Sequence, residues 1–383
     1  MGSKAGEKQM QQEPIRIAQI MGKMNRGGVE SVVMNYYRAI DKSRIQFDFF
    51  VDEDSAFPQR AELEKAGAGI YFLPPYSRMW AWQKRLYELL RHNNYAVIHC
   101  HINTMNFFPL FTAWRARIPV RICHNHSTAH WGEWKKTLLK YILRPLTRMA
   151  ATDWFACGEK AALWMYGKKA VDSGRVIIVP NTIDTGRFIF DSKQRSSLRQ
   201  KFGISEETLV VGHVGRYTYA KNHEFLLHVF ACLLQKVPDA KLLLVGEGEC
   251  AEQIQECLQH LNLEQSVVQA GPQQEPAPYY STMDVFCMPS FYEGMPVVAL
   301  EAQASGLPVL FSEAVTGEVL VSDQAMRIPL EKGPEFWAEC LYKLAQQKKD
   351  RTQAGACVAN AGFECTQAAA WLAELYQQKA KRG

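Results

Sequence analysis

Two glutamates at a fixed spacing, Glu293 and Glu301, are the side chains of this sequence best suited to hold a polar ligand. The apolar run over residues 285–289 predicts a buried strand just before them. Pro296 suits the first position of a helix, where its missing N–H costs nothing. Glu293 would then lie in the loop before that helix and Glu301 in its second turn, about 8–10 Å apart along the axis.

This separation is too long for the two carboxylates to share one proton, but it would allow them to bind two parts of one ligand. The helix N-terminus between them offers unpaired N–H groups and a partial positive charge, which favour an anion. Because two acids repel a phosphate, we expect them to face hydroxyl groups. A ligand with phosphate in the middle and hydroxyls at both ends is a nucleotide sugar. In the alternative interpretation, Glu293 caps the helix and Glu301 is a solvated surface residue.

The same stretch resembles a known enzyme family. Glu293 and Glu301, within Glu-Gly-x-Pro and followed by Gly-Leu-Pro at 306–308, resemble the retaining glycosyltransferases of family four. The resemblance covers nearly the whole chain and implies the GT-B architecture, an α/β fold in which two Rossmann-like domains face a cleft. It further implies that Glu301 holds the ribose of the donor, while Glu293 and the backbone after it hold the sugar. The residues of that backbone are Gly294, Met295, Pro296 and Val297.

The composition of the 383-residue chain is that of a soluble globular protein with room for two domains. It is 47% hydrophobic and 22% charged, and a net charge of +5 permits anionic ligands or membrane surfaces without requiring nucleic acid. The ten scattered cysteines form no C-x-x-C pair, which is typical of reduced thiols in a cytosolic protein. No apolar run reaches the ~18 residues of a membrane span, and polar residues 1–13 predict a disordered leader.

Strand-like and helix-like segments alternate twice along the chain, which predicts two parallel sheets covered by helices on both faces. The first series, residues 14–184, is expected to form the acceptor domain, and residues 185–366 the donor domain. Polar residues 184–207 are typical of a linker. The resemblance implies that the last helix, about 367–383, crosses back to the first domain. Strands are expected at residues 15–21, 47–51, 70–73, 96–101, 120–124, 154–157 and 176–179, and then at 209–214, 241–245, 267–270, 285–288 and 309–311.

A glycine pair, Gly27 and Gly28, follows Arg26 after the first predicted strand and opens a helix. Glycines allow a backbone to approach a ligand closely, although the segment matches neither G-x-G-x-x-G nor the P-loop pattern. The resemblance implies that both glycines face the donor diphosphate and the acceptor. The alternative is an ordinary tight turn between a strand and a helix.

Two cations, Arg216 and Lys221, flank the loop after the first strand of the second series. Open α/β sheets bind ligands at the carboxyl ends of their strands, and two cations there can hold a diphosphate and stabilise charge on a leaving group. The resemblance implies this role for both. The alternative is a solvated basic loop.

Two further motifs suggest competing chemistry. Residues 246–251 match G-x-G-x-x-A between a strand and a helix, but Glu247 and Glu249 would repel a pyrophosphate, and no acid follows the next strand to hold a ribose. A dehydrogenase is therefore disfavoured. The triplet Asp52-Glu53-Asp54 spells D-x-D, a pattern that can hold a metal on a diphosphate, yet it comes too early in the chain and is more typical of a solvated turn.

Four histidines end two successive predicted strands, as His99 and His101 and then His124 and His126. Strand alternation places each pair on one face. The four residues could form a zinc site or simply mark two polar strand ends, and the sequence leaves both interpretations open. The resemblance favours His126, in its Asn-His-Ser context, as a residue that lines the sugar and the acceptor.

These features together predict a retaining glycosyltransferase that moves a sugar from a nucleotide-diphosphate donor, UDP-linked by expectation, to a polysaccharide or lipid-linked acceptor. By resemblance, catalysis needs no cofactor or metal and rests on positioning and leaving-group electrostatics. The alternatives are a nucleotide-sugar 2-epimerase of the same fold and a non-catalytic nucleotide-sugar binding protein. The residues assigned to catalysis are His126, Arg216, Lys221 and Glu293.

Residues 132–150 predict an amphipathic helix, which connects the expected cytoplasmic location with a membrane surface. Its basic residues, Lys136, Lys140, Arg144 and Arg148, recur every four positions and would form a stripe, with Trp131 and Trp134 at one end. Basic residues beside an anionic leaflet, with tryptophans at headgroup level, would hold the first domain on the inner face of the membrane. In the alternative, the apolar side packs on the sheet and the basic side is solvated. Pro145 is expected to kink or interrupt the helix.

Overall fold

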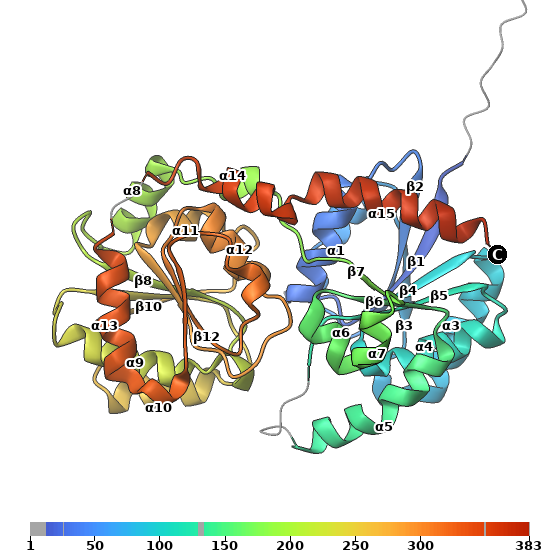
Figure 1. Cartoon of the computed structure of the whole chain (residues 1–383), viewed down its shortest axis with the longest axis horizontal. Helices are drawn as coiled ribbons and strands as arrows, with labels where there is room; N and C mark the ends of the chain where they lie inside the picture. Colours follow the sequence, from blue (N-terminus) through green and yellow to red (C-terminus); the bar gives the residue numbers. More distant parts are fainter. Residues whose placement is uncertain (1–12, 26, 129–133, 348–349, 383) are drawn as a thin grey trace, which may run out of the picture.

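The computed structural model describes residues 13–25, 27–128, 134–347 and 350–382. The predicted leader therefore lies outside the described residues except for Glu13, and so do Arg26 and Trp131. The chain forms two α/β units side by side, each built on one parallel sheet (Figure 1).

The first sheet has seven parallel strands in the order β3-β2-β1-β4-β5-β6-β7. All eight residues of β2 are buried, as expected for a strand covered on both faces. The strands are β1 (Ile15–Gly22), β2 (Ile45–Asp52), β3 (Gly69–Leu73), β4 (Val97–Cys100), β5 (Val120–Asn125), β6 (Asp153–Ala156) and β7 (Val176–Ile178). The helices are α1 (Gly28–Ala39), α2 (Arg60–Lys65), α3 (Met79–Asn93), α4 (Phe107–Arg115), α5 (Trp134–Ala150), α6 (Glu159–Tyr166) and α7 (Lys168–Asp172), with short 3-10 turns at η1 (Tyr76–Arg78) and η2 (Asn103–Asn106).

The second sheet has six parallel strands in the order β10-β9-β8-β11-β12-β13. Its strands are β8 (Val210–Val214), β9 (Lys241–Val245), β10 (Val267–Gly271), β11 (Val285–Met288), β12 (Val309–Ser312) and β13 (Ala325–Ile328). Its helices are α8 (Ser192–Lys201), α9 (His223–Leu234), α10 (Ala251–His260), α11 (Ala277–Thr282), α12 (Val297–Ala304), α13 (Gly333–Ala345) and α14 (Ala354–Val358), and its short helical turns are η4 (Thr185–Phe188), η5 (Tyr219–Lys221), η6 (Gly317–Val319), η7 (Leu330–Lys332) and η8 (Ala359–Phe363).

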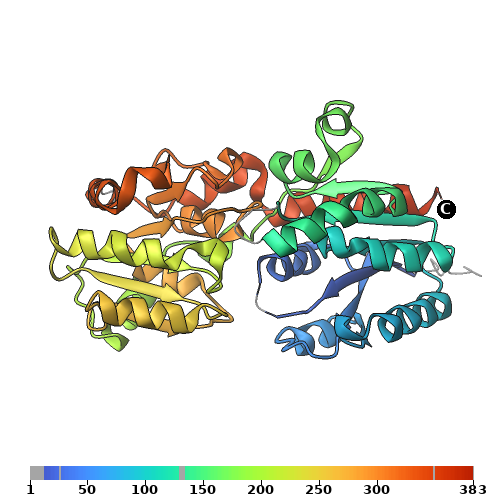
Figure 2. The ribbon, with the colours of Figure 1, turned by 90° about the horizontal axis from the view of Figure 1, so that it is seen from below.

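Two parallel sheets flanked by helices confirm the predicted α/β fold with two Rossmann-like units (Figure 2). In both sheets the strand order reverses next to the first strand of the unit, beside β1 and beside β8. Open α/β sheets bind ligands at such a switch point, outside the carboxyl ends of the strands. The loops after β1, β4, β5, β8 and β11 are therefore the segments on which a site depends.

The last helix, α15 (Cys365–Ala380), runs along the first unit and packs on α1 and β4 (Figure 1). The Tyr376 ring meets Phe47 edge to face, with 5.9 Å between the centroids. Lys379 forms an ion pair with Asp153 that is largely buried. The chain thus leaves the second unit and ends against the sheet with which it began.

The structure corrects four details of the predicted elements. The segment 184–207 is not an open linker, because η4 and α8 lie within it and the buried Arg199 of α8 is bound to Asp284. The short strand β13 was not predicted. Pro145 lies inside α5 without ending it. Pro296 is the residue before α12 rather than its first residue.

The two units meet at the loop that precedes α12. A Cβ atom placed on Gly294 would lie 2.0 Å from the carbonyl oxygen of His126, at the end of β5. The carbonyl of Met295 accepts a hydrogen bond of 2.5 Å from the Asn181 side chain. Only glycine allows this approach of two backbones, so the contact fixes the distance between His126 and the loop that carries Glu293.

We expect Gly294→Ala to weaken this contact, because the added methyl group meets backbone atoms that cannot turn away. Overpacking of this kind costs about 1–3 kcal/mol. Amide hydrogen exchange over residues 293–297 and 124–128, together with thermal unfolding, measures the effect. Gly28→Ala is the matched control, since a Cβ there meets no atom within 4 Å. Equal exchange and equal melting temperatures for the two variants would contradict the proposed role of Gly294.

Candidate active site

An ion pair between Lys221 and Glu293 forms the centre of the candidate site. Lys221 ends η5, just after β8, and Glu293 lies in the loop between β11 and α12. The Lys221 Nζ donates to Glu293 Oε1 at 2.7 Å, and the Ser290 hydroxyl donates to the same oxygen at 2.7 Å. The side chains are 16% and 12% exposed. The loops after two neighbouring strands thus bring together two groups that the sequence placed 72 residues apart.

Glu301 lies in the second turn of α12, as predicted, but it is buried rather than solvated. Its Oε2 accepts a hydrogen bond of 2.6 Å from the Tyr280 hydroxyl. Burial disfavours the charged form and raises the pKa of Glu301 to about 7, against smaller lowering effects of Tyr280 and Arg187. A ligand that donates hydrogen bonds to the carboxylate would therefore stabilise the ionised form of Glu301.

Arg216 is more exposed than Lys221. Its guanidinium is 58% exposed and lies 3.5 Å from the carboxylate of Glu249, which is itself 57% exposed. Exposed pairs at this distance contribute little free energy. Arg216 is therefore held weakly and is free to adopt another partner.

Gly27 and Gly28 open α1, as predicted, and the carboxylate of Glu30 fills the space beside Gly27. Glu30 Oε1 accepts a hydrogen bond of 3.3 Å from the backbone N–H of Asn25. Burial raises the pKa of Glu30, and the charge of Arg216 in the second unit lowers it. The glycine loop thus carries an acidic group and faces a basic residue of the opposite unit.

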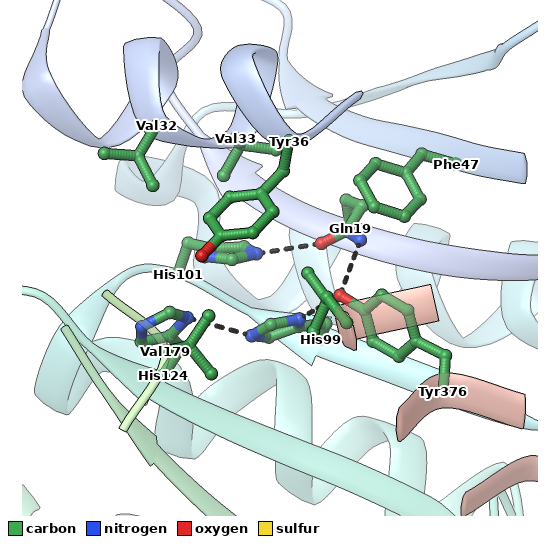
Figure 3. Close-up of a pocket in the computed structure, with 11 residues that line it drawn as sticks. Gln19, Val32, Val33, Tyr36, Phe47, His99, His101, His124, Val179 and Tyr376 are labelled. Carbon is green, nitrogen blue, oxygen red and sulfur yellow. Dashed lines mark hydrogen bonds between the residues drawn. The ribbon is translucent and has the colours of Figure 1, made fainter. Parts of the chain in front are cut away.

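The four histidines lie together in one buried cluster at the ends of β4 and β5. His99 Nε2 lies 3.1 Å from His124 Nδ1, and His101 Nδ1 lies 2.9 Å from His126 Nε2. The cluster continues to Gln19 of β1 and Tyr376 of α15 (Figure 3). Burial lowers the pKa of all four imidazoles, that of His126 to about 3. The four rings are therefore neutral at physiological pH.

One ring nitrogen each of His99, His101 and His124 lies within 4.8 Å of the others, which satisfies the spacing of a metal site. A metal ion would have to displace hydrogen bonds that already engage both ring nitrogens of His99 and His101 and the Nδ1 of His124. Of these three rings, His124 alone has a nitrogen, Nε2, without a partner among the described residues.

Tertiary contacts explain the two competing motifs. A Cβ on Gly246 would lie 2.0 Å from the Gly215 carbonyl oxygen, and one on Gly248 would lie 2.3 Å from that of Tyr217. The G-x-G pattern therefore serves loop packing inside the second unit. The prediction of a solvated D-x-D turn was wrong for Asp52, which is buried and accepts a hydrogen bond of 3.0 Å from Trp82 Nε1. Asp54 pairs instead with Lys23.

The structure brings Lys221 to Glu293 and His126 to Gly294, while Glu301 lies deeper, against Tyr280. Reasoning from the sequence missed Tyr280, Glu30, Gln19 and Tyr376. Of these, Glu30 could have been noticed as an acid one turn after the glycine pair. The other three reach the site through contacts between distant strands and helices, for which the sequence carries no local signal.

Comparisons with known proteins agree with this geometry. A family model described as "Glycosyltransferase Family 4" matches residues 26–187, and one described as "Glycosyl transferases group 1" matches residues 208–347. The putative glycosyltransferase EpsF of Bacillus subtilis is 32% identical over 369 residues, which cover 94% of this chain and 96% of that protein.

Two further relatives share less sequence. The UDP-Gal:alpha-D-GlcNAc-diphosphoundecaprenol alpha-1,3-galactosyltransferase of Escherichia coli is 26% identical over 62% of this chain and 63% of its own length. The crystal structure of Anabaena HepE in complex with UDP and glucose superposes with a TM-score of 0.79, covering 95% of this chain and all of that chain at 19% identity. With both units matched and the fold shared, the chain belongs to glycosyltransferase family 4 and is a glycosyltransferase of the GT-B fold.

Proposed function

We propose that the protein is a retaining glycosyltransferase that takes its sugar from a UDP-sugar and passes it to a polysaccharide or lipid-linked acceptor. The observation that carries the proposal is the arrangement around α12: a buried Glu301 behind the helix start and the Lys221–Glu293 pair before it. In this arrangement Glu301 holds the ribose hydroxyls. Glu293 and the backbone of residues 294–297 hold the sugar, and the diphosphate lies between.

Lys221 and Glu293 neutralise each other before the donor binds. When the donor binds, it gives each of them a new partner. The diphosphate replaces the carboxylate beside Lys221, and sugar hydroxyls replace the ammonium group beside Glu293. Separating a pair of low exposure without such replacements leaves uncompensated charge and is strongly unfavourable. The loop is therefore selective for a ligand that presents an anion and hydroxyls at the same spacing.

Arg216 completes the charge balance from the opposite side of the loop. Its weak pairing with Glu249 allows it to move to the diphosphate and to stabilise the leaving group as charge develops. The glycine pair and His126 face the reacting sugar and the acceptor from the first unit. Transfer needs no metal in this arrangement, because Arg216 and Lys221 supply the positive charge.

The UDP and acceptor assignments are supported by relatives rather than by a contact of this chain. Anabaena HepE was crystallised with UDP and glucose, and the Escherichia coli relative is named for UDP-Gal and a diphosphoundecaprenol-linked acceptor. The other candidate functions remain distinguishable. A 2-epimerase would convert a UDP-sugar without an acceptor, and a binding protein would bind UDP without consuming any donor.

A panel of nucleotide sugars tests the proposal. We expect UDP and one UDP-sugar to raise the melting temperature, and that UDP-sugar to be consumed only with an acceptor such as a lipid-diphosphate glycan. Turnover should persist in EDTA, since Arg216 and Lys221 take the place of a metal. Retention of the anomeric configuration, measured by NMR, tests the stereochemistry. Consumption without acceptor, or activity that requires Mn²⁺ or Mg²⁺, would contradict the proposal.

The pKa of Glu301 predicts how donor affinity depends on pH. Ribose hydroxyls bind best to the ionised carboxylate, and the pKa near 7 in the free protein means that deprotonation is incomplete below neutral pH. Affinity for a UDP-sugar, whose diphosphate does not titrate near pH 7, should be about 10-fold weaker at pH 6 than at pH 8. Glu301→Gln should bind weakly at every pH, with a loss of roughly 10–150-fold at pH 8.

Isothermal titration calorimetry from pH 5.5 to 8.5 measures this dependence. The exposed Glu256 of α10 provides the control variant Glu256→Gln, which should retain the wild-type profile. A wild-type affinity that does not change with pH, or a Glu301→Gln variant that binds as tightly as the wild type, would remove Glu301 from the donor site.

A membrane contact forms the second part of the proposed function, and its geometry differs from the predicted one. The apolar side of α5 faces solvent: Leu138 is 52%, Ile142 57% and Met149 80% exposed. The polar side faces the protein, where Thr147 is fully buried and donates a hydrogen bond of 2.7 Å to Thr104. The alternative prediction, an apolar side packed on the sheet, was therefore wrong.

Two residues of the predicted basic stripe, Lys140 and Arg144, are turned toward the protein. Lys140 donates to the carbonyl of Thr128 at 3.0 Å, and Arg144 donates to that of Trp164 at 2.9 Å. Neighbouring α4 adds Phe111 and Trp114, which are 36% and 58% exposed. Among the described residues, no helix has the length and apolar character of a membrane span. In the proposed arrangement this apolar surface of α4 and α5 enters the headgroup region of a cytoplasmic membrane face, near a lipid-linked acceptor.

Vesicle co-sedimentation tests this surface. Ile142→Asp should lower vesicle binding by roughly 10–100-fold, the loss expected when one buried aliphatic side chain no longer enters an apolar phase. Phe336→Asp on α13 is the control, because Phe336 is similarly exposed, at 45%, in the other unit. Binding should persist partly in high salt, since apolar contact dominates. Equal binding of both variants and the wild type would leave the enzyme without this membrane surface.

A further inference from the structure

Gln19, in the middle of the first sheet, connects the four histidines to the last helix. Its side chain is 1% exposed, and Tyr376, to which it is bound, is separated from it by 357 positions in the sequence. Gln19 Oε1 lies 2.8 Å from His101 Nε2, and Gln19 Nε2 donates to the Tyr376 hydroxyl at 3.3 Å. In Figure 3 the Gln19 amide lies between His101, which its oxygen faces, and Tyr376, which its nitrogen faces.

The hydrogen bonds that start at the amide oxygen determine which nitrogen carries the proton in His101 and His126. The oxygen can only accept, so His101 Nε2 carries a proton and donates it. Because burial keeps His101 neutral, its Nδ1 has no proton and accepts from His126 Nε2, 2.9 Å away. His126 Nδ1 is then an acceptor without a proton, and it is buried with no partner among the described residues.

The hydrogen bonds that start at the amide nitrogen also place the proton of each ring on Nε2. Gln19 Nε2 donates to the Tyr376 oxygen, so Tyr376 donates its own proton to His99 Nδ1 at 2.6 Å. His99 Nε2 then donates to His124 Nδ1, 3.1 Å away. His124 Nε2 carries the last proton and, like His126 Nδ1, has no partner among the described residues. All four rings are therefore neutral with the proton on Nε2.

We propose that Gln19, His101 and Tyr376 are positioning residues that keep His126 in the Nε2–H tautomer, so that its bare Nδ1 accepts a hydrogen bond from a substrate hydroxyl. The part of this inference that concerns the substrate hydroxyl rests on the proposed function, whereas the tautomer of His126 does not depend on it. The backbone around His126 is held as well, because its N–H donates to Asn103 at 2.8 Å and its carbonyl contacts Gly294. The last helix thus contributes to the active site without touching substrate.

Turning the Gln19 amide by half a rotation would reverse every bond of both chains. Each ring would then carry its proton on Nδ1, and His126 would offer a donor to the same hydroxyl. The tyrosine hydroxyl couples the two hydrogen-bond chains, because it accepts from the amide N–H of Gln19 while it donates to His99, so both chains run in the observed direction together. Loss of the Tyr376 hydroxyl removes that coupling and leaves the amide of Gln19 held only by His101.

The tautomers can be measured without any substrate. Long-range ¹⁵N–¹H correlation spectra of histidine-labelled full-length protein at pH 7, assigned with single His→Gln variants, should show Nε2–H on His99, His101, His124 and His126. Elemental analysis of the same sample should show no stoichiometric metal. Nδ1–H on His126, an imidazolium ring in the cluster, or a bound metal with shifted ring nitrogens would each overturn the proposal.

Two variants test the effect on activity with the UDP-sugar selected by the panel. Tyr376→Phe should lower kcat/KM by roughly 3–10-fold, the effect of one neutral hydrogen bond, and should show mixed tautomers at His126. Tyr36→Phe is the control: Tyr36 borders the same cavity, but its hydroxyl donates to the Pro180 carbonyl and not to the cluster. Equal losses in both variants, with unchanged tautomers, would contradict a positioning role.

Gln19→Glu gives a signature that lost packing alone would not produce. A carboxylate beside His101 Nε2 raises the pKa of that ring, so protonation at low pH reverses the bond to His126. At saturating donor, where the pH-dependent donor affinity set by Glu301 no longer limits the rate, kcat should then acquire a loss below about pH 7 that the wild type lacks. Among the described residues, the titratable groups that face His101 and Gln19 are His99, His124, His126, Tyr36 and Tyr376. The ion pair of Lys379 with Asp153 lies on the Phe155 ring, which packs against His99.

The two kinds of measurement separate the possible failures. If the wild type consumes no donor, the proposed function fails, while the tautomer assignment is still decided by the spectra. If donor is consumed and the pH profile of Gln19→Glu matches the wild type, the positioning role fails alone. UDP affinity, which depends on the second unit, should be unchanged in all three variants and shows that they are folded.

Discussion

The close backbone contact between Gly294 and His126 is the constraint on which the rest of this active site depends. It joins the end of a strand in one sheet to the loop that opens a helix beside the other sheet. Because no side chain separates the two backbones, the imidazole cluster and the Lys221–Glu293 pair are held at one fixed distance. A substrate that extends from one unit to the other could then bind to the imidazole cluster and the ion pair without any rearrangement of the two.

The charged groups of the candidate site share one property: each interacts with another group of the protein that a ligand could replace. Lys221 is neutralised by Glu293, Arg216 is loosely paired with Glu249, and Glu301 is held near its titration point by burial. In the proposed function, these pairings keep buried charge compensated while no donor is bound. Binding energy is then spent on exchanging the partners of these groups, which favours a ligand with hydroxyls and phosphates in matching positions.

The first unit places unlike surfaces on opposite sides of its sheet. On one side α15 closes over the histidine cluster and ties the end of the chain to the strand ends. On another, α5 turns its threonines, Lys140 and Arg144 inward and exposes Leu138, Ile142 and Met149, the reverse of an ordinary surface helix. The proposed sugar site rests on the first of these features, and the proposed membrane contact rests on the second.

Most strands and helices, and their order, could be predicted from the sequence, whereas α8 and β13 could not. Continuous apolar runs predicted the strands to within a few residues, and the glycine and proline around Glu293 and Glu301 located the main loop, because these signals act between neighbours in the chain. The partners were decided only by the tertiary structure. Glu301 is buried against Tyr280, and the G-x-G loop packs on Gly215 and Tyr217. Gln19 meets a tyrosine 357 positions away, and α5 exposes its apolar side. Burial and hydrogen-bond direction depend on which distant elements pack together, and local periodicity carries no information about that choice.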